Sequence, residues 1–298
     1  MFPLKPHVPY PAPKRCLTLL ALVLCGLHTA PSLAAPGPGD LLVAPTRVLF
    51  AGRTRNAEIT LVNLGETAAT YRISFVELRM DERGGTREIE ATEALPGENF
   101  ASSMVRFSPR QVRLEPKVAQ LVRLQLRPGP TSDAGGPAAR EYRSHLLFRA
   151  IPESWLGGAE AESEAAATGV AVQLVPVYGV SVPVIVRQGE ASATARLLDL
   201  ELAAPDRPGD PPRLVFRIER EGNASLYGNL IATFTPRGGK SRILGEANGV
   251  AVYAPNPFRS VSLLLQVPPE LREQAGTLHL TYQAPSREIL AEARLELP

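Results

Sequence analysis

The feature that most constrains this chain is a long apolar run at residues 169–187, with the sequence GVAVQLVPVYGVSVPVIVR. Its branched side chains recur at every second position, which is typical of a β-strand and not of a helix. The run also contains Pro176 and Pro183. Proline donates no hydrogen bond to a sheet, so it favours an edge, an end or a bulge. We therefore expect a bend or a change of partner near Gly179.

Two interpretations of this strand are open at this point. An ordinary sandwich would bury the strand in its interior. A long apolar edge strand is otherwise an aggregation hazard that proteins hide. An edge that is kept open would instead serve to pair with another chain.

Residues 1–34 are predicted to be a secretory signal. They begin with a positive segment and continue with an apolar segment, residues 16–27, that is too short to span a bilayer. Small residues up to Ala34 form the cleavage site, so the mature chain is expected to start near Ala35. No second apolar run reaches membrane-spanning length. We therefore expect a periplasmic or secreted protein without membrane insertion.

Removal of the signal changes the bulk properties of the chain. The full sequence has 32 Lys and Arg against 30 Asp and Glu, and the signal contains Lys5, Lys14 and Arg15 but no acidic residue. The mature chain then has 29 against 30, a net charge near −1, which does not favour nucleic acid as a partner. Both cysteines, Cys16 and Cys25, are lost with the signal, so the mature protein is predicted to form no disulfide.

Short alternating segments separated by turn signals fill the rest of the chain. No segment keeps an apolar period of about 3.6 residues. The fold class is therefore predicted to be all-β, with two tandem immunoglobulin-like β-sandwich domains at residues 35–187 and 188–298, and a polar surface loop at 155–168. The other predicted strands are residues 41–50 (interrupted at Pro45), 58–63, 70–80, 104–107, 111–114, 119–127, 140–151, 193–202, 213–219, 225–235, 242–254, 260–267, 277–283 and 289–297.

The sequence shows little that would support catalysis. The mature chain has two histidines, His145 and His279, each inside a predicted strand and without a second histidine nearby. Metal ligation needs clustered ligands, so we interpret both as structural. No nucleophile elbow, zinc-protease motif or dinucleotide fingerprint occurs. We predict a protein that is not an enzyme and that holds no metal and no cofactor.

Arg47 is the one polar residue that we single out. It follows Pro45-Thr46 and starts the segment Val48-Leu49-Phe50. A guanidinium beside a sheet edge can bind a carboxylate through two parallel hydrogen bonds. The alternative is a solvated arginine at a strand end, because most exposed charges contribute little.

These segments together resemble the periplasmic chaperones of pilus and fimbria assembly, the PapD-like family. The similarity rests on four motifs in the same order as in that family. The motifs are residues 45–50 (PTRVLF), residues 113–116 (RLEP) followed by 121–124 (LVRL), residues 140–152 with their Arg-Glu start and FRAIP end, and the run at 169–187. The resemblance covers residues 40–187 by motif and 188–298 by pattern and order alone.

The resemblance implies two sandwiches in an L-shaped arrangement, with pilin-like subunits bound in the cleft and an outer-membrane usher as a second partner. It implies strand addition, in which a chaperone strand fills the groove of a subunit that lacks its own last strand. On this mapping Val170, Val172 and Leu174 are the donor side chains. Arg47 corresponds to the arginine that anchors the subunit's terminal carboxylate.

One position departs from the family pattern. The family usually has a lysine beside that arginine, where this chain has Ser181, and no lysine occurs between residues 118 and 239. Three explanations are open: Arg47 is the only anchor, another arginine helps, or the client presents no carboxylate.

The predicted function is therefore that of a periplasmic chaperone that binds pilus subunits by donor-strand complementation and delivers them for assembly. In the free protein the donor side chains are expected to be exposed, or shielded by self-association through the edge strand. The alternative is an exported structural or adhesin-type β-sandwich protein without a client. A secreted hydrolase is a third class, disfavoured by the missing catalytic motifs.

Overall fold

The computed structural model describes residues 40–127, 140–152, 177–205, 207, 210–271 and 274–298, and all of these belong to one unit, Pro36–Pro298. Their regular structure is β-strand apart from two 3-10 turns, η1 (Ala91–Glu93) and η2 (Pro269–Leu271). Within this part of the chain no helix is long and apolar enough to cross a membrane. The fold class is therefore all-β, as predicted.

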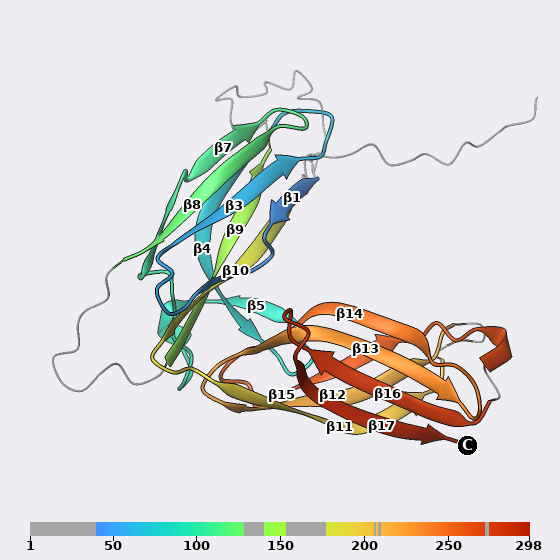
Figure 1. Ribbon diagram of the computed structural model, residues 1–298. Helices are drawn as coiled ribbons and strands as arrows, with labels where there is room; N and C mark the ends of the chain where they lie inside the picture. The colour runs from blue at the N-terminus through green and yellow to red at the C-terminus, as the bar shows by residue number, and fades with distance from the viewer. Residues whose placement is uncertain (1–39, 128–139, 153–176, 206, 208–209, 272–273) are drawn as a thin grey trace, which may run out of the picture. The chain divides into compact units, whose positions relative to one another are not determined.

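The first sandwich consists of two sheets, drawn as two layers in Figure 1. One sheet has the order β1-β3-β8-β6, with strands β1 (Leu41–Ala44), β3 (Asn56–Asn63), β8 (Ala119–Leu126) and β6 (Val105–Ser108). The other has the order β2-β10-β9-β4-β5, and β7 also pairs with β4. Its strands are β2 (Val48–Phe50), β10 (Gly179–Gln188), β9 (Arg140–Ile151), β4 (Ala69–Met80), β5 (Thr86–Ile89) and β7 (Gln111–Leu114).

The second sandwich has seven strands in two sheets, ordered β11-β12-β15 and β14-β13-β16-β17. The first of these sheets contains β11 (Ala193–Ala203), β12 (Arg213–Gly222) and β15 (Phe258–Leu264). The second contains β14 (Arg242–Val252), β13 (Leu226–Pro236), β16 (Gly276–Gln283) and β17 (Ile289–Leu297). The predicted number of seven strands is confirmed for this sandwich.

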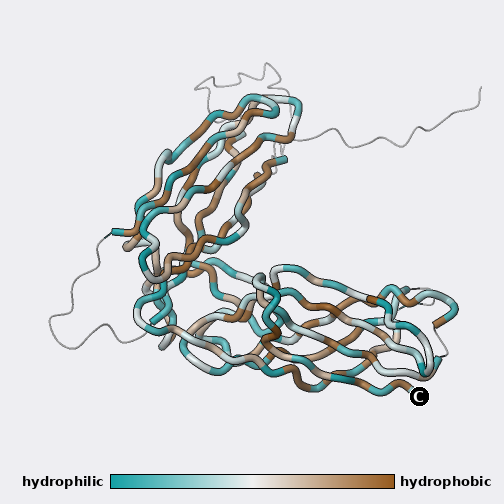
Figure 2. Tube along the Cα trace, viewed as in Figure 1, coloured by the Kyte–Doolittle hydropathy of each residue, from teal (hydrophilic) through white to brown (hydrophobic). Residues whose placement is uncertain are grey.

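Each sandwich has its own core, built from alternate residues of its strands. Strand β13 shows the pattern most clearly, because every second side chain from Leu226 to Pro236 is buried. Figure 2 shows the same alternation of apolar and polar residues along many strands. The largest fully buried side chains include Tyr71, Phe50 and Phe148 in the first core, and Tyr282 and Phe216 in the second.

The first strand is interrupted at Pro45, as predicted, and the interruption moves the chain from one sheet to the other. β1 pairs antiparallel with β3, whereas β2 pairs parallel with β10. The described part of the first sandwich has ten strands, two more than the eight segments predicted for it, because this strand is split and because β5 was not foreseen. The β5 segment is short and polar, and three of its four side chains are exposed.

Candidate functional site

Strand β10 is the described part of the apolar run, and its two edges differ. One edge pairs antiparallel with β9 from Gly179 to Gln188. The other pairs with β2 only from Val184 to Val186. Among the described strands, the edge over residues 179–183 therefore has no pairing partner. A strand of another chain could add there through main-chain hydrogen bonds.

The side chains of β10 begin to enter the first core near Val182. Val182, Val184 and Val186 are at most 1% exposed, so the buried interpretation holds for this half of the run. Val177 and Tyr178, just before the strand, are 38% and 53% exposed. The proposed donor side chains Val170, Val172 and Leu174 lie outside the described residues, so their role stays a prediction.

Arg47 lies just before β2 and is not a solvated strand-end residue. Its side chain is half-buried, and its guanidinium carbon lies 4.4 Å from the centre of the Tyr227 ring, at a distance typical of a cation–π contact. The Nε atom is buried and has no hydrogen-bond partner among the described residues. Burial lowers the pKa of Arg47, and the nearby Arg187 lowers it further.

Arg47 and Arg187 line the same cavity of about 640 Å³, together with Ser225, Tyr227 and Leu290. Arg187 lies near the end of β10, so the turn before β2 and the end of β10 bring two guanidinium groups to one site. Ser181, where the family would have a lysine, is exposed on β10 opposite Leu147. The second cation of the cavity is therefore an arginine six residues later in the chain.

Arg187 is held in place by a buried carboxylate. Its Nε donates to Glu141 Oε2 at 2.9 Å, and its Nη2 donates to the Ser225 carbonyl at 2.8 Å. The Glu141 side chain is 3% exposed and also accepts hydrogen bonds from the Ser225 backbone N–H at 3.0 Å and from its hydroxyl. Glu141 thus neutralises Arg187. No described carboxylate forms an ion pair with Arg47, so the cavity keeps an excess positive charge.

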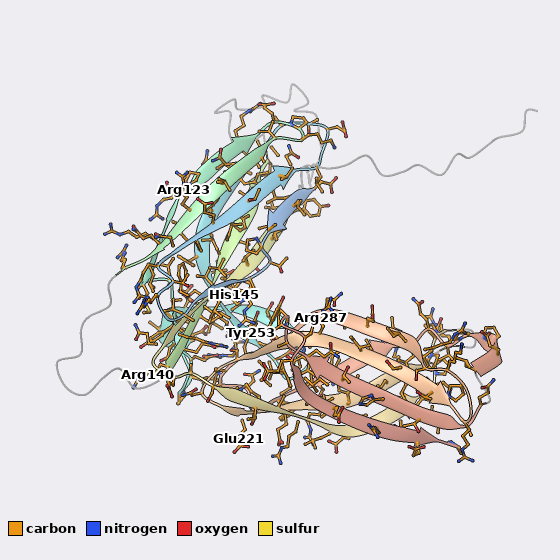
Figure 3. All side chains as sticks on the ribbon, in the orientation of Figure 1. Arg123, Arg140, His145, Glu221, Tyr253 and Arg287 are labelled. Carbon is orange, nitrogen blue, oxygen red and sulfur yellow. The ribbon has the colours of Figure 1, made fainter. Side chains whose placement is uncertain are left out.

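A second cluster lies further along the same face of β9. The Arg143 guanidinium is 4.1 Å from the Tyr253 ring centre, and the His145 ring lies edge-on to Tyr253 at 5.9 Å (Figure 3). Burial lowers the pKa of His145 from 6.5 to about 3, with a smaller contribution from Arg143. Among the described residues, no three His, Cys, Asp or Glu side chains form a group suited to a metal ion. His145 is a buried neutral residue in this setting.

This burial predicts a pH-dependent stability. Because the unfolded chain binds a proton at His145 below about pH 6.5 and the folded chain does not until about pH 3, stability falls as the pH decreases through this window. We expect His145 to cost about 2 kcal/mol of stability at pH 5 relative to pH 7. Urea unfolding of wild type and His145→Asn at both pH values measures this. An equal loss of stability in the two proteins would contradict it.

Sequence reasoning found Arg47 but not Arg187, Glu141, Ser225 or Tyr227. Arg187 was visible only as the last residue of the apolar run. Ser225 and Tyr227 belong to the other sandwich, about 180 residues from Arg47 along the chain. No sequence motif predicts their contacts with Arg47 and Arg187, because these contacts are tertiary.

Comparison with known proteins gave only structural neighbours. No family model matches the chain, and no curated protein matches it. The solved structure of the YadV chaperone is similar at a TM-score of 0.41 and 10% identity, covering 87% of this chain and all of that one. The E. coli chaperone DraB has a TM-score of 0.40 and 13% identity, covering 87% of this chain and 96% of that one.

A third similar structure is the Pseudomonas aeruginosa CupB2 chaperone, with a TM-score of 0.39 and 11% identity, covering 86% of this chain and 98% of that one. All three are named as chaperones, the class that the sequence motifs resemble. At this identity and these scores the likeness does not assign the chain to a family. The proposals below therefore rest on the residues of this chain.

Proposed function

We propose that the protein is an exported, non-catalytic chaperone that binds pilin-like subunits by adding a strand to them and delivers them to an outer-membrane usher. The observation that supports this best is that an open strand edge lies next to Arg47. The β10 edge over residues 179–183, which has no partner among the described strands, lies in line with β2, and Arg47 directly precedes β2. A client strand paired along this edge would end at a positively charged cavity.

Arg47 is the proposed anchor for the client's terminal carboxylate. It lines the cavity and forms no ion pair with a described carboxylate, so a client carboxylate bound there would supply the missing negative charge. The Tyr227 ring, 4.4 Å from the guanidinium carbon, stabilises Arg47 in this position through a cation–π contact. Arg187 places a second guanidinium in the same cavity, but Glu141 balances its charge, so Arg47 carries the excess positive charge and Arg187 can only assist it.

The proposed location is the periplasm, reached through the signal at residues 1–34, and no cofactor is part of the proposed activity. The alternative of a client-free structural or adhesin-type protein is favoured by one observation. From Val182 onward, β10 is an internal core strand whose valines are shielded. The two functions differ in the role of the segment before Gly179: it binds the client in the first and has no client in the second. The variant Leu174→Asp distinguishes them.

Replacing Arg47 by alanine is expected to weaken client binding by about 2 kcal/mol or more, because a desolvated carboxylate would lose its partner. Arg47→Lys is also expected to bind less well, because an ammonium cannot form the two parallel hydrogen bonds. The measurement is the yield of a pilin-like subunit that co-purifies after co-expression, together with the thermal stability of each variant.

Arg53→Ala is a matched control, because Arg53 is an exposed arginine in the turn after β2. It should leave both the yield and the stability unchanged. A normal subunit yield with Arg47→Ala would remove Arg47 from the site. A subunit whose terminal carboxylate is extended by a tag should bind wild type and Arg47→Ala equally weakly.

A further inference from the structure

The proposed chaperone site does not use the outer face of the sheet β1-β3-β8-β6. Strands β1, β3 and β8 lie side by side in Figure 1, and alternate residues of each point away from the first core. The cross-strand register arranges these outward residues in rows. The rows change in character from one end of the strands to the other.

Two rows are apolar except for Thr60, and we call them the apolar end. Leu42, Val62 and Ala119 are direct neighbours in one row, and Ala44, Thr60 and Leu121 are neighbours in the next. Leu42 and Leu121 are 47% and 40% exposed. Leu64 and Val118, in the turns that border this end, are also exposed. Four of the twelve large apolar side chains that are exposed in the described chain therefore gather here.

The opposite end is basic. Arg123 lies between Glu58 and Ser108 in the third row, and Arg106 lies opposite Gln125 in the fourth. Arg127 follows β8 with the same outward direction, and Arg123 is labelled in Figure 3. The Arg123–Glu58 ion pair is long, 3.3 Å, and both side chains are more than half exposed, so it contributes little. Arg106 and Arg127 have no ion pair among the described residues.

The local charge of the basic end, and not the charge of the whole domain, favours an anionic partner. Residues 35–187 contain 17 Lys and Arg against 17 Asp and Glu, so the domain as a whole is balanced. The basic end itself has three exposed arginines, Arg106, Arg123 and Arg127, against one carboxylate, Glu58. Exposed apolar patches of this kind mark surfaces that bind a protein or a membrane. The cavities of about 1180 and 640 Å³ found in the described part of the chain are lined by residues outside this face.

We propose that this outer face docks onto an anionic phospholipid surface. Its leucines would enter the boundary between headgroups and acyl chains, as apolar side chains of peripheral membrane proteins do. Its guanidinium groups would bind lipid phosphates, for which their planar fork is well suited. A flat face with adjacent apolar and basic ends satisfies both requirements at once. The contact would be peripheral and reversible.

Co-sedimentation of the mature chain with vesicles tests this proposal. We expect binding to vesicles of phosphatidylglycerol and phosphatidylethanolamine, and much weaker binding to pure phosphatidylcholine. Added salt should weaken the binding, because exposed charges are screened. The double variants Leu42→Ser/Leu121→Ser and Arg106→Gln/Arg127→Gln should each reduce binding by about tenfold or more.

Leu264→Ser and Arg294→Gln are the matched controls. Both residues are exposed on strands of the second sandwich, and both changes should leave vesicle binding as in wild type. Circular dichroism and thermal unfolding confirm that each variant is folded. No binding by the wild type, equal binding to both lipid mixtures, or binding unchanged in the face variants would each overturn the proposal. Loss of client delivery in the face variants with unchanged vesicle binding would indicate a protein partner and also overturn it.

Discussion

Replacement of Leu174 by aspartate is expected to abolish the proposed capture of a pilin-like subunit while leaving the client-free protein folded. Leu174 is the last of three proposed donor side chains, and all three alternate along the segment before β10. Burial of each in a subunit should contribute about 1.5–3 kcal/mol. A carboxylate in a subunit pocket would lose this contribution and add the cost of an unpaired charge. Co-purified subunit and urea midpoints of the client-free protein measure the two effects separately.

Val182→Asp is the matched control for this experiment. Val182 has the same parity in the run, but its side chain is 1% exposed in the first core. The aspartate should destabilise the free protein itself, by more than about 4 kcal/mol. If Leu174→Asp instead lowered the client-free midpoint as much as Val182→Asp does, Leu174 would be a core residue and the client-free alternative would gain.

Arg187→Ala is expected to have the second-largest effect, a loss of about 3–5 kcal/mol in the free energy of unfolding. The reason is the Glu141 carboxylate, which is 3% exposed and has Arg187 as its only ion-pair partner among the described residues. Removal of the guanidinium leaves that charge buried with only the hydrogen bonds from Ser225. Urea unfolding of wild type and variant measures the loss.

Two comparisons separate this mechanism from general damage. The Arg196–Glu219 pair is equally short, 2.8 Å, but the Arg196 side chain is 66% exposed, so Arg196→Ala should cost less than about 1 kcal/mol. The double variant Arg187→Ala/Glu141→Gln should be more stable than Arg187→Ala alone, because it leaves no buried carboxylate without a cation. Equal stability of the single and double variants would show that the lost packing of Arg187 dominates.

The sequence predicted the strands well because alternation is a local property. Strands β7, β9 and β17 have the predicted bounds, and most of the others agree within about two residues. The failure at β5 has a physical cause. Its side chains Thr86, Arg87 and Glu88 are exposed, and the strand exists because it pairs with the end of β4. Pairing of this kind leaves no apolar period in the sequence.

The candidate site was predictable only in part, for a related reason. Arg47 could be singled out because it adjoins a proline-interrupted strand. Its burial, however, comes from Tyr227, and the fixed position of Arg187 comes from Glu141 and Ser225. These contacts join residues that are distant in the chain, so no sequence motif predicts them. A sequence can suggest which guanidinium is important, but the charge balance of a cavity depends on tertiary packing.

The parallel pairing of β2 with β10 fixes the polarity of any strand that is anchored at Arg47. Because Val48 lies beside Val184, Arg47 lies near the level of Pro183. A client strand whose terminal carboxylate reaches Arg47 must therefore run in the same direction as β10. Parallel pairing is slightly less stable per residue than antiparallel pairing. Under the proposed function, a client held in this orientation would therefore pair slightly more stably with an antiparallel partner strand than with β10.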